Sequence, residues 1–378
     1  MTTRRALVVG GGPAGLATAL ALRDAGWDAL VLERSADVGP SGVALTLWPN
    51  ALSALAAVGA DKPVRAAGCP ADGNQIRAAD GRILDDVPGP LMAERFGGRG
   101  LALLRADLVE ALRAQLSPGM LRTGARCVGW TESGGRVRAT LADGGTEEGD
   151  LLVGADGLRS TIRRQLLGGG ADPLRYAGYP VWRGIARYEL GAAPGLLTMG
   201  RAAQFGLFPL PEGRAYWFAT MPLRRGWGEQ LPRRVWSARF DGWHAPIPQV
   251  LAATPDEDIL VTDIYDRAPV PRWSAGRVVL VGDAAHPSTP NLGQGTCQAL
   301  EDAVVLGRCL RDYDVAGALP RYEAARRRRA DGLTRQARML GRVGQWSNPV
   351  ACWIREQMIR RAPAGPRLRQ MAEMFAFE

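Results

Sequence analysis

Histidine and paired cysteines are scarce in this chain. Its 378 residues contain only two histidines, His244 and His286, so a His-rich metal site is not available. The five cysteines are Cys69, Cys127, Cys297, Cys309 and Cys352. Their number is odd and no C-x-x-C pair occurs. We therefore expect reduced thiols in a cytoplasmic protein, with neither a disulfide framework nor a metal centre.

Long apolar runs are also missing. A bilayer-spanning helix needs about 18 or more consecutive apolar residues, and the sequence has no such run. Arginines precede a short apolar stretch near the start, but glycines from Gly10 end that stretch after four residues. A signal peptide needs an apolar region of roughly 7–15 residues. We expect neither a signal peptide nor a membrane span.

Lysine is almost absent, because Lys62 is the only one in the chain. The net charge of +9 is carried by arginine, most densely at Arg326 to Arg329. This charge fits nucleic-acid binding, or an arginine-rich coding bias combined with attraction for anionic nucleotide cofactors. The run lies in a stretch that predicts an exposed helix, and no nucleic-acid motif accompanies it. We favour the second explanation and expect no nucleic-acid partner.

The pattern of apolar residues predicts an α/β protein. Strands at 6–9 and 27–32 flank a helix at 13–25, which forms a compact strand–helix–strand unit. Further helices are expected at 50–58, 104–116, 297–310 and 321–342, and a hairpin at 137–152. Alternating segments from 176 to 264 predict an antiparallel sheet.

We therefore expect a Rossmann-like FAD-binding domain interrupted by an antiparallel β-sheet substrate domain, followed by C-terminal helices. The predicted ranges are 1–70, 97–175 and 263–330 for the first domain, 71–96 and 176–262 for the second, and 331–378 for a C-terminal helical segment.

The first motif is Gly10-Gly11-Gly12-Pro13-Ala14-Gly15, which fits G-x-G-x-x-G. Its glycines permit a tight turn, close approach to a pyrophosphate and close packing of helix on strand. The helix that follows offers free N–H groups to phosphates. Glu33 ends the second strand, where it can bind a ribose hydroxyl. The motif indicates dinucleotide binding, without distinguishing FAD from NAD.

Two later motifs are less specific when taken alone. A strand at 151–153 runs into Gly154-Ala155-Asp156-Gly157-Leu158-Arg159-Ser160, which a plain surface corner would explain equally well. A strand at 278–281 ends at Gly282-Asp283, and Pro290-Asn291-Leu292-Gly293-Gln294-Gly295 then opens a helix at Thr296. Such a helix start can face the anionic edge of a reduced flavin, although a well-capped structural helix has the same pattern.

Together and in this order, the three motifs resemble those of the class A flavoprotein monooxygenases, the para-hydroxybenzoate hydroxylase family, and most closely its salicylate-hydroxylase-like branch. The run from Gly293 to Asp302 is close to that family's pattern. The resemblance implies bound FAD, with NADPH or NADH as a transient electron donor and O2 as co-substrate. It implies oxygen transfer from a flavin C4a-hydroperoxide, in an enzyme of secondary metabolism that is a monomer or homodimer.

The resemblance also assigns cofactor contacts. By analogy, Glu33 and Arg34 meet the adenosine ribose, Arg105 contacts the pyrophosphate or ribityl, and Cys127 lies beside the adenine. Asp283 holds the ribityl, and Asp156 with Arg159 serves both FAD and NAD(P)H. The full predicted set is Gly10, Gly12, Pro13, Ala14, Gly15, Glu33, Arg34, Arg105, Cys127, Asp156, Arg159, Gly282, Asp283, Pro290, Gly293, Gln294, Gly295 and Thr296.

The substrate sheet departs from the family's pattern. Relatives that hydroxylate phenols often carry His-x-x-x-Tyr, where this chain has Gln204 to Phe208. Neither Gln204 nor Phe208 can act as a base. We therefore expect no certain catalytic side chain and a small apolar or aromatic substrate that needs no phenol deprotonation. An indole, an electron-rich alkene or a terpenoid-like ring would fit, with hydroxylation or epoxidation as the reaction. The predicted pocket residues are Gln204, Phe205, Phe208, Trp217 and Pro290, although the aromatic ones could simply fill the core of the sheet.

Other functions remain open at this point. A flavoprotein of the same fold could act as a reductase or cyclase without inserting oxygen. A halogenase would need a lysine near the site, and Lys62 lies far from any expected one. A NAD-binding dehydrogenase would not need the two later motifs. A regulator that binds the cofactor without catalysis would leave no clear mark in the sequence.

Overall fold

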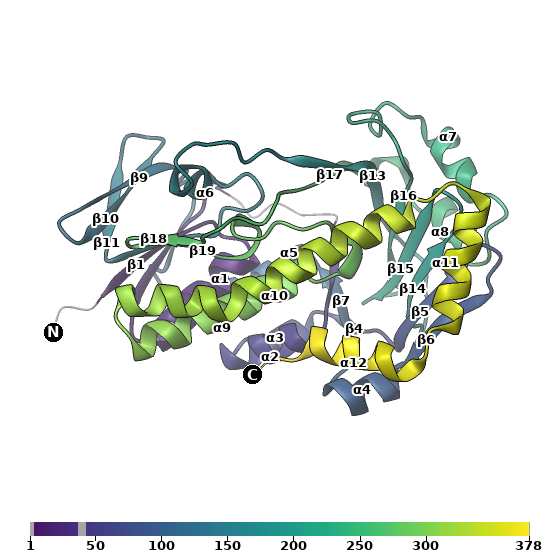
Figure 1. Cartoon of the computed structure of the whole chain (residues 1–378), viewed down its shortest axis with the longest axis horizontal. Coiled ribbons are helices and arrows are strands. Elements are labelled where there is room, and N and C mark those ends of the chain that lie inside the picture. Colours follow the sequence, from purple (N-terminus) through teal and green to yellow (C-terminus); the bar gives the residue numbers. More distant parts are fainter. Residues whose placement is uncertain (1–3, 37–42, 378) are drawn as a thin grey trace.

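The computed structural model describes residues 4–36 and 43–377. A six-stranded sheet carries the expected dinucleotide motifs and a seven-stranded sheet forms the other end of the molecule (Figure 1). In spatial order the first sheet is β18 (Ser274–Ala275), β19 (Val278–Leu280), β12 (Leu151–Gly154), β1 (Arg5–Val9), β2 (Asp28–Leu32) and β8 (Leu121–Arg122).

The second sheet is made from distant parts of the chain. Its order is β17 (Leu260–Asp266), β13 (Arg175–Ala186), β16 (Arg214–Thr220), β15 (Gln204–Leu210), β14 (Gly195–Met199), β5 (Gly73–Ala78) and β6 (Ile83–Pro88). All neighbouring strands in it are antiparallel except β14 and β5. The two segments expected in the substrate domain thus share one sheet.

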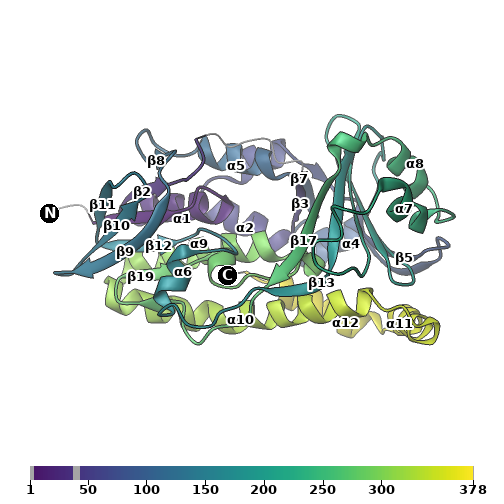
Figure 2. The same cartoon turned by 90° about the horizontal axis from the view of Figure 1, so that it is seen from above.

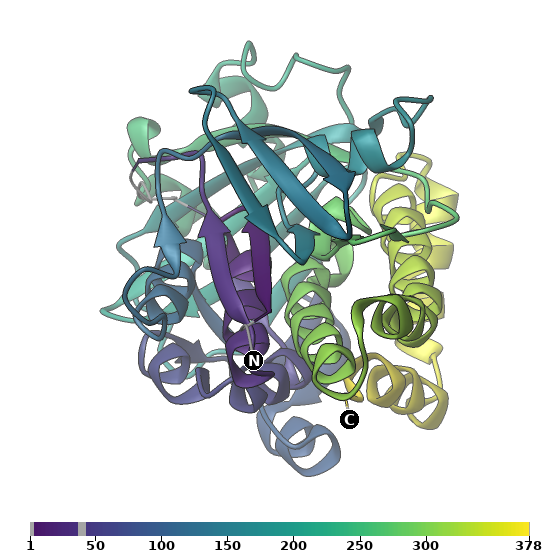
Figure 3. The ribbon, with the colours of Figure 1, turned by 90° about the vertical axis from the view of Figure 1, so that its left-hand side faces the viewer.

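Two small sheets complete the strands. One is β11 (Thr146–Gly149), β10 (Arg136–Leu141) and β9 (Cys127–Ser133), and the other is β3 (Ala44–Leu47), β7 (Leu101–Leu104) and β4 (Cys69–Pro70). Val137 and Ala139 of β10 share a buried core with Leu7 and Val8 of β1 because the first small sheet lies over the parallel one (Figure 3). Antiparallel pairing of β10 with β11 confirms the expected hairpin.

The helices are α1 (Pro13–Asp24), α2 (Pro49–Ala57), α3 (Asp61–Ala66), α4 (Gly89–Phe96), α5 (Arg105–Arg113), α6 (Thr161–Leu166), α7 (Arg233–Ser237), α8 (Ile247–Ala252), α9 (Gly295–Asp312), α10 (Val315–Gly344), α11 (Pro349–Arg361) and α12 (Ala364–Phe375). Short 3-10 turns include η3 (Gly282–Ala284) and η4 (Pro290–Leu292). The predicted fold class is confirmed, although α3, α4, α6, α7 and α8 lie where no helix was expected.

The long helix α10 runs alongside both large sheets (Figure 2). The domain boundary expected between residues 330 and 331 falls inside this helix. Residues 1–3, 37–42 and 378 of the predicted ranges lie outside the described residues. Among the described residues, no helix is both long and apolar enough to cross a membrane.

Candidate active site

The three motifs meet at one edge of the parallel sheet. Val9 lies opposite both Leu32 and Gly154, and Gly154 lies opposite Leu280, in strands that all run in the same direction. Each strand therefore ends at the same level, and the residues that follow them are neighbours. In open α/β sheets this edge, beyond the carboxyl ends of the strands, is where ligands bind.

Motif one has no space for side chains at its turn. Gly10 has φ +114°, and a Cβ there would lie 2.4 Å from Ala155 O of motif two. A Cβ on Gly15 would lie 1.8 Å from Gly10 O. The N-cap of α1 is Gly12, followed by Pro13, so no side chain caps this end of the helix. The first N–H groups of α1 are therefore available to a phosphate.

Motif three packs directly on motif one. A Cβ added to Gly282 would lie 3.0 Å from the Cβ of Ala14 and also 3.0 Å from that of Ala299 in α9. Gly293 has φ +62°, and its missing side chain leaves room for the Trp48 indole. Gln294 is the N-cap of α9, whose first residues are Gly295 and Thr296. The starts of α1 and α9 are thus brought together.

Charged side chains surround these helix starts. Glu33 Oε2 accepts a hydrogen bond of 2.6 Å from Gly11 N, and Arg34 beside it is exposed. Arg105 is the first residue of α5, and its side chain is exposed. Its Nη2 atom lies 3.3 Å from the point where a Cβ on Gly12 would stand. These groups lie where a dinucleotide's ribose and pyrophosphate would need them.

Asp283 lies in η3 between the buried residues Gly282 and Ala284, and its own side chain is exposed to solvent. Loss of hydration raises the pKa of its carboxyl, while His286 and Arg105 act in the opposite direction. A Cβ on Gly295 would lie 3.8 Å from Asp283 Oδ1, so the carboxylate is next to the start of α9. An accessible carboxylate in this position can accept a bond from a polyol such as ribityl.

Asp156 of motif two is used within its own turn. It accepts hydrogen bonds from the Ser160 hydroxyl, from Thr161 N at 2.7 Å and from Ile162 N at 3.3 Å. Burial raises the pKa of Asp156 despite these bonds. Its carboxylate thus stabilises the start of α6, while Arg159 is exposed nearby. Contacts of either residue with FAD or NAD(P)H remain a prediction.

Sequence analysis did not identify Arg163 as a link between motifs two and three. This buried guanidinium donates to Ala284 O at 3.0 Å and to Ala285 O at 2.6 Å. It also pairs with Asp172 at 2.7 Å. Arg163 fixes the loop that carries Asp283, but nothing in the sequence distinguishes it from its exposed neighbour Arg164.

A buried polar network continues from motif three to α10. His286 Nε2 lies 2.6 Å from Asp302 Oδ2, and Arg326 Nε donates to Asp302 Oδ1 at 2.8 Å. Burial alone would raise the pKa of Asp302, but His286 and Arg326 hold it below its usual value. His286 is therefore a support for the loop, and Arg326 is buried, although the sequence predicted an exposed basic run there.

Cys127 and His244 have structural surroundings. Burial raises the pKa of the Cys127 thiol, which donates to Gly129 O at 3.4 Å. Contact between Cys127 and the adenine remains a prediction. His244 Nε2 lies 2.9 Å from Thr198 Oγ1 of β14 in the seven-stranded sheet, so this imidazole bonds within the sheet structure.

The predicted pocket residues divide between the two faces of the seven-stranded sheet. Phe205 is fully buried and stacks on Trp217, with ring centroids 5.6 Å apart. Both belong to a core with Trp236 and Phe240, beneath the segment that carries α7 and α8. The prediction that Phe205 and Trp217 line a substrate pocket is wrong, because side chains alternate along a strand and these two point away from the sheet face that packs on Ala44 and Ala102.

Gln204 and Phe208 point toward the other face. Phe208 is partly exposed and stacks with Phe218 at 6.5 Å between centroids. A Cβ on Gly206 would lie 2.0 Å from the Phe218 ring, so this ring lies flat over the strand. We call Phe208, Tyr216 and Phe218 the aromatic wall. It packs with Ala44 and Ala102 of the small sheet, and Leu104, next to Arg105, adjoins the same cluster.

The short turn η4 joins this face to the sheet edge where the three motifs meet. Asn291 follows the predicted residue Pro290, which is exposed, and its Oδ1 accepts a bond of 2.6 Å from the Tyr179 hydroxyl of β13. A Cβ on Gly341 of α10 would lie 2.8 Å from Asn291 Oδ1, and one on Gly344 would lie 2.2 Å from Gln204 Nε2. The two carboxamides are therefore packed against glycines of the same helix.

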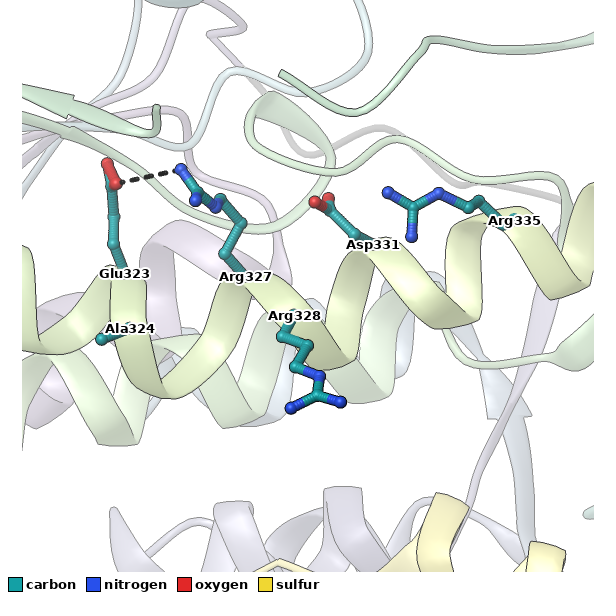
Figure 4. A pocket seen from close by; sticks show the side chains of 6 residues that line it. All are labelled: Glu323, Ala324, Arg327, Arg328, Asp331 and Arg335. Atoms are coloured by element: carbon teal, nitrogen blue, oxygen red, sulfur yellow. Dashed lines mark ion pairs between the residues drawn. The ribbon is translucent and has the colours of Figure 1, made fainter. Parts of the chain in front are cut away.

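A separate pocket of about 260 Å³ lies on α10 (Figure 4). Asp331 and Arg335 project on the same side of the helix as the Glu323–Arg327 ion pair, and Arg328 points away from them. None of its lining residues belongs to the predicted cofactor or substrate sets. It is therefore distinct from the site at the sheet edge.

The residues at the sheet edge fit an FAD molecule. Two uncapped helix starts face one region, glycines leave room for backbone approach, and Glu33, Arg105 and Asp283 surround it. Arg105 and the helix starts can bind the pyrophosphate and the anionic flavin edge, Glu33 the adenosine ribose, and Asp283 the ribityl chain.

Comparisons with known proteins agree with this geometry. The family described as "FAD binding domain" matches residues 3–337. Aurachin C monooxygenase/isomerase from Stigmatella aurantiaca is 41% identical over 360 residues, which cover 94% of this chain and 93% of that protein. 2-Heptyl-3-hydroxy-4(1H)-quinolone synthase from Pseudomonas aeruginosa is 35% identical, with 98% and 97% covered.

A solved structure matches over nearly the whole chain. Klebsiella pneumoniae HpxO complexed with FAD and uric acid superposes with a TM-score of 0.91 at 30% identity, covering 98% of this chain and 96% of that one. These similarities confirm FAD as the dinucleotide that the sheet edge binds. The chain belongs to the FAD binding domain family and, within it, to the class A FAD-dependent monooxygenases.

Proposed function

We propose that this chain uses NADPH or NADH to reduce FAD, and transfers one oxygen atom from O2 to an alkyl-substituted 4-quinolone or a similar flat, weakly polar ring. The observation that carries the proposal is the aromatic wall on the flavin side of the sheet, where Phe218 adjoins Tyr179, the hydrogen-bond partner of Asn291. Two relatives whose names include a monooxygenase and a quinolone synthase support this substrate class.

The wall supplies apolar stacking surface without a base. Phe208 and Phe218 can stack on a bicyclic ring. Burial raises the pKa of Tyr216, so its hydroxyl stays protonated at neutral pH. The charge that acts on Tyr216 is that of Arg183, whose guanidinium donates a 3.1 Å hydrogen bond to Thr262 on the edge strand β17. A 4-quinolone fits because its ring nitrogen already makes carbon 3 nucleophilic, and no deprotonation is needed.

The side chains have the tasks of binding, orienting and excluding water. The aromatic wall covers one face of the ring, and the Asn291 carboxamide, held at Oδ1 by Tyr179, offers its Nδ2 to the ring carbonyl. Reduced FAD supplies the activated oxygen when bound. A dry site protects that chemistry from water.

The test combines spectra with isotope labelling. The flavin absorbance of the purified protein is recorded anaerobically, before and after NADPH or NADH, with 4-quinolones, indoles and phenols present in turn. We expect a quinolone to accelerate bleaching, and one atom of 18O from labelled O2 to enter the product. Bleaching without label in any product would instead favour the alternative, a flavoenzyme of the same fold that acts without oxygen insertion.

A further inference from the structure

We propose that α11 docks the protein on an anionic membrane surface. Its outer side carries Val350, Trp353, Ile354 and Met358, which are 64%, 59%, 43% and 68% exposed. We call these four residues the apolar face of α11. Their spacing of three, one and four residues places them on one side of the helix. A row of large apolar side chains this exposed indicates a surface that another phase or molecule covers.

The opposite side of α11 is anchored to the protein. Arg355 is buried and donates to Gly200 O at 2.9 Å and to Val343 O at 3.3 Å. Cys352, also buried, donates from Sγ to Trp346 O at 3.2 Å. Asn348 caps the helix through bonds to the first two free amides. The apolar face is therefore held outward by a fixed helix.

The charges around the apolar face favour an anionic partner. Glu356 is the only carboxylate of α11, and it is turned inward and paired with Arg82 at 3.2 Å. Arg360 and Arg361 at the end of the helix are exposed. The outer side of the helix thus combines apolar residues, a tryptophan and arginines. This is the composition of helices that lie in the headgroup region of anionic bilayers.

Lipid fits this face better than a second copy of the chain does. Arg361 is seven residues beyond Ile354, so it lies on the same side of the helix. Pairing two copies through this face would desolvate Arg361 with no carboxylate on α11 turned toward it. A lipid phosphate would pair with the same guanidinium. The exposed Trp346 adds a second ring suited to the headgroup level.

The proposed docking surface lies at one end of the molecule. The helix lies at the end of the molecule that carries the seven-stranded sheet, next to its edge strand β6 (Figures 1 and 2). The proposal does not depend on the identity of the substrate, because it concerns a surface remote from the motifs that bind FAD.

The experiment measures sedimentation of the FAD-loaded protein with vesicles. We expect binding to vesicles of phosphatidylcholine with phosphatidylglycerol, weaker binding to pure phosphatidylcholine, and loss of binding in high salt. Replacing Trp353 and Met358 together by serine should lower the partition coefficient by roughly tenfold or more. Arg360→Glu with Arg361→Glu should remove the preference for phosphatidylglycerol.

Matched controls separate docking from misfolding. Val128→Ser removes an exposed apolar side chain from β9, at the opposite end of the molecule, and Arg65→Glu reverses an exposed charge on α3. Both should bind vesicles as the unchanged protein does, and all variants should retain FAD. The proposal is overturned if the unchanged protein ignores anionic vesicles, or if the Trp353 and Met358 double variant binds them equally well. Self-association that this double variant abolishes, without vesicle binding, would also overturn it.

Discussion

The Tyr179 hydroxyl donates a hydrogen bond of 2.6 Å to Asn291 Oδ1 and so joins the substrate sheet to the loop of motif three. Burial raises the pKa of Tyr179 to about 12, so the hydroxyl remains a donor at any physiological pH. With its oxygen occupied, the carboxamide of Asn291 has a fixed orientation, and its nitrogen is the atom left to face a ligand.

Removing this bond should weaken quinolone binding. We expect Tyr179→Phe to raise the dissociation constant by about fivefold, the equivalent of one hydrogen bond, and Asn291→Leu to raise it at least as much. The measurement is an anaerobic titration followed by flavin absorbance. Tyr265→Phe is the control, because that hydroxyl bonds Asp263 at the sheet edge. Equal affinity in all three variants would exclude Asn291 from substrate binding.

Phe208 and Phe205 should have different roles although they lie three residues apart. Phe208→Ala removes part of the aromatic wall, and we expect quinolone affinity to fall roughly tenfold with little loss of stability. Phe205→Ala opens the core beside Trp217 and should lower the free energy of unfolding by about 3–5 kcal/mol. Urea unfolding and the same titration distinguish the two. Unchanged affinity in Phe208→Ala would remove this residue from the proposed pocket.

Two glycine-to-alanine changes in helices should have opposite effects. At Gly332 of α10 a Cβ meets nothing within 4 Å, so alanine should stabilise the helix by about 1 kcal/mol. At Gly15 of α1 the Cβ would stand 1.8 Å from Gly10 O, and this clash outweighs the same helical gain. We expect Gly15→Ala to lose FAD during purification while Gly332→Ala keeps it, as flavin absorbance per protein will show.

Arg163→Met should loosen the loop that carries Asp283. Breaking a buried ion pair typically costs about 3–5 kcal/mol, and the carbonyls of Ala284 and Ala285 lose their donor as well. We expect a lower free energy of unfolding and a higher dissociation constant for FAD. The exposed Arg164→Met is the matched control. If both variants bind FAD like the unchanged protein, the loop does not need this link.

Asp331 should reduce stability at neutral pH. Its Oδ1 is buried with no hydrogen-bond partner among the described residues, and burial raises its pKa. A raised carboxyl pKa in the folded state means that the ionised form, present above that pKa, opposes folding. Asp331→Asn should therefore raise stability at pH 7 by about 1 kcal/mol.

The gain from Asp331→Asn should shrink as the pH falls, and vanish below about pH 4, where the unfolded carboxyl is also protonated. Melting temperatures of the two proteins across this range give the measurement. An advantage independent of pH would mean that the effect is not electrostatic.

The meeting of the three motifs at one sheet edge follows from the sequence because its signals are local. A glycine turn between a strand and a helix leaves no room for a Cβ at Gly10 or Gly15, and the structure shows backbone atoms at both places. Parallel strands then bring Glu33 and Asp283 to the same edge without any further information. Arg163 could not be found in this way, because its partners Ala284 and Ala285 are backbone groups 121 and 122 residues away.

The substrate side was only half predictable. Alternation along β15 shows that Phe205 and Phe208 point to opposite faces, but not which face meets the flavin. That choice depends on the segment with α7 and α8, which covers Phe205 and whose short helices have little periodicity. The sequence also gives no packing partner for Phe375 near the C-terminus, and the structure places it against Trp48, with ring centroids 5.3 Å apart.

Helix α10 limits how the two ends of the molecule can move. Its 30 residues form a rod about 45 Å long, which Arg326 bonds to Asp302 near the middle and Arg338 bonds to Asp266 toward the C-terminal end. A hinge between the sheets would have to bend this rod or strip its buried ion pairs. Substrate entry and product exit must therefore come from movements of single loops or side chains, while the distance between the cofactor's sheet and the aromatic wall stays constant through each turnover.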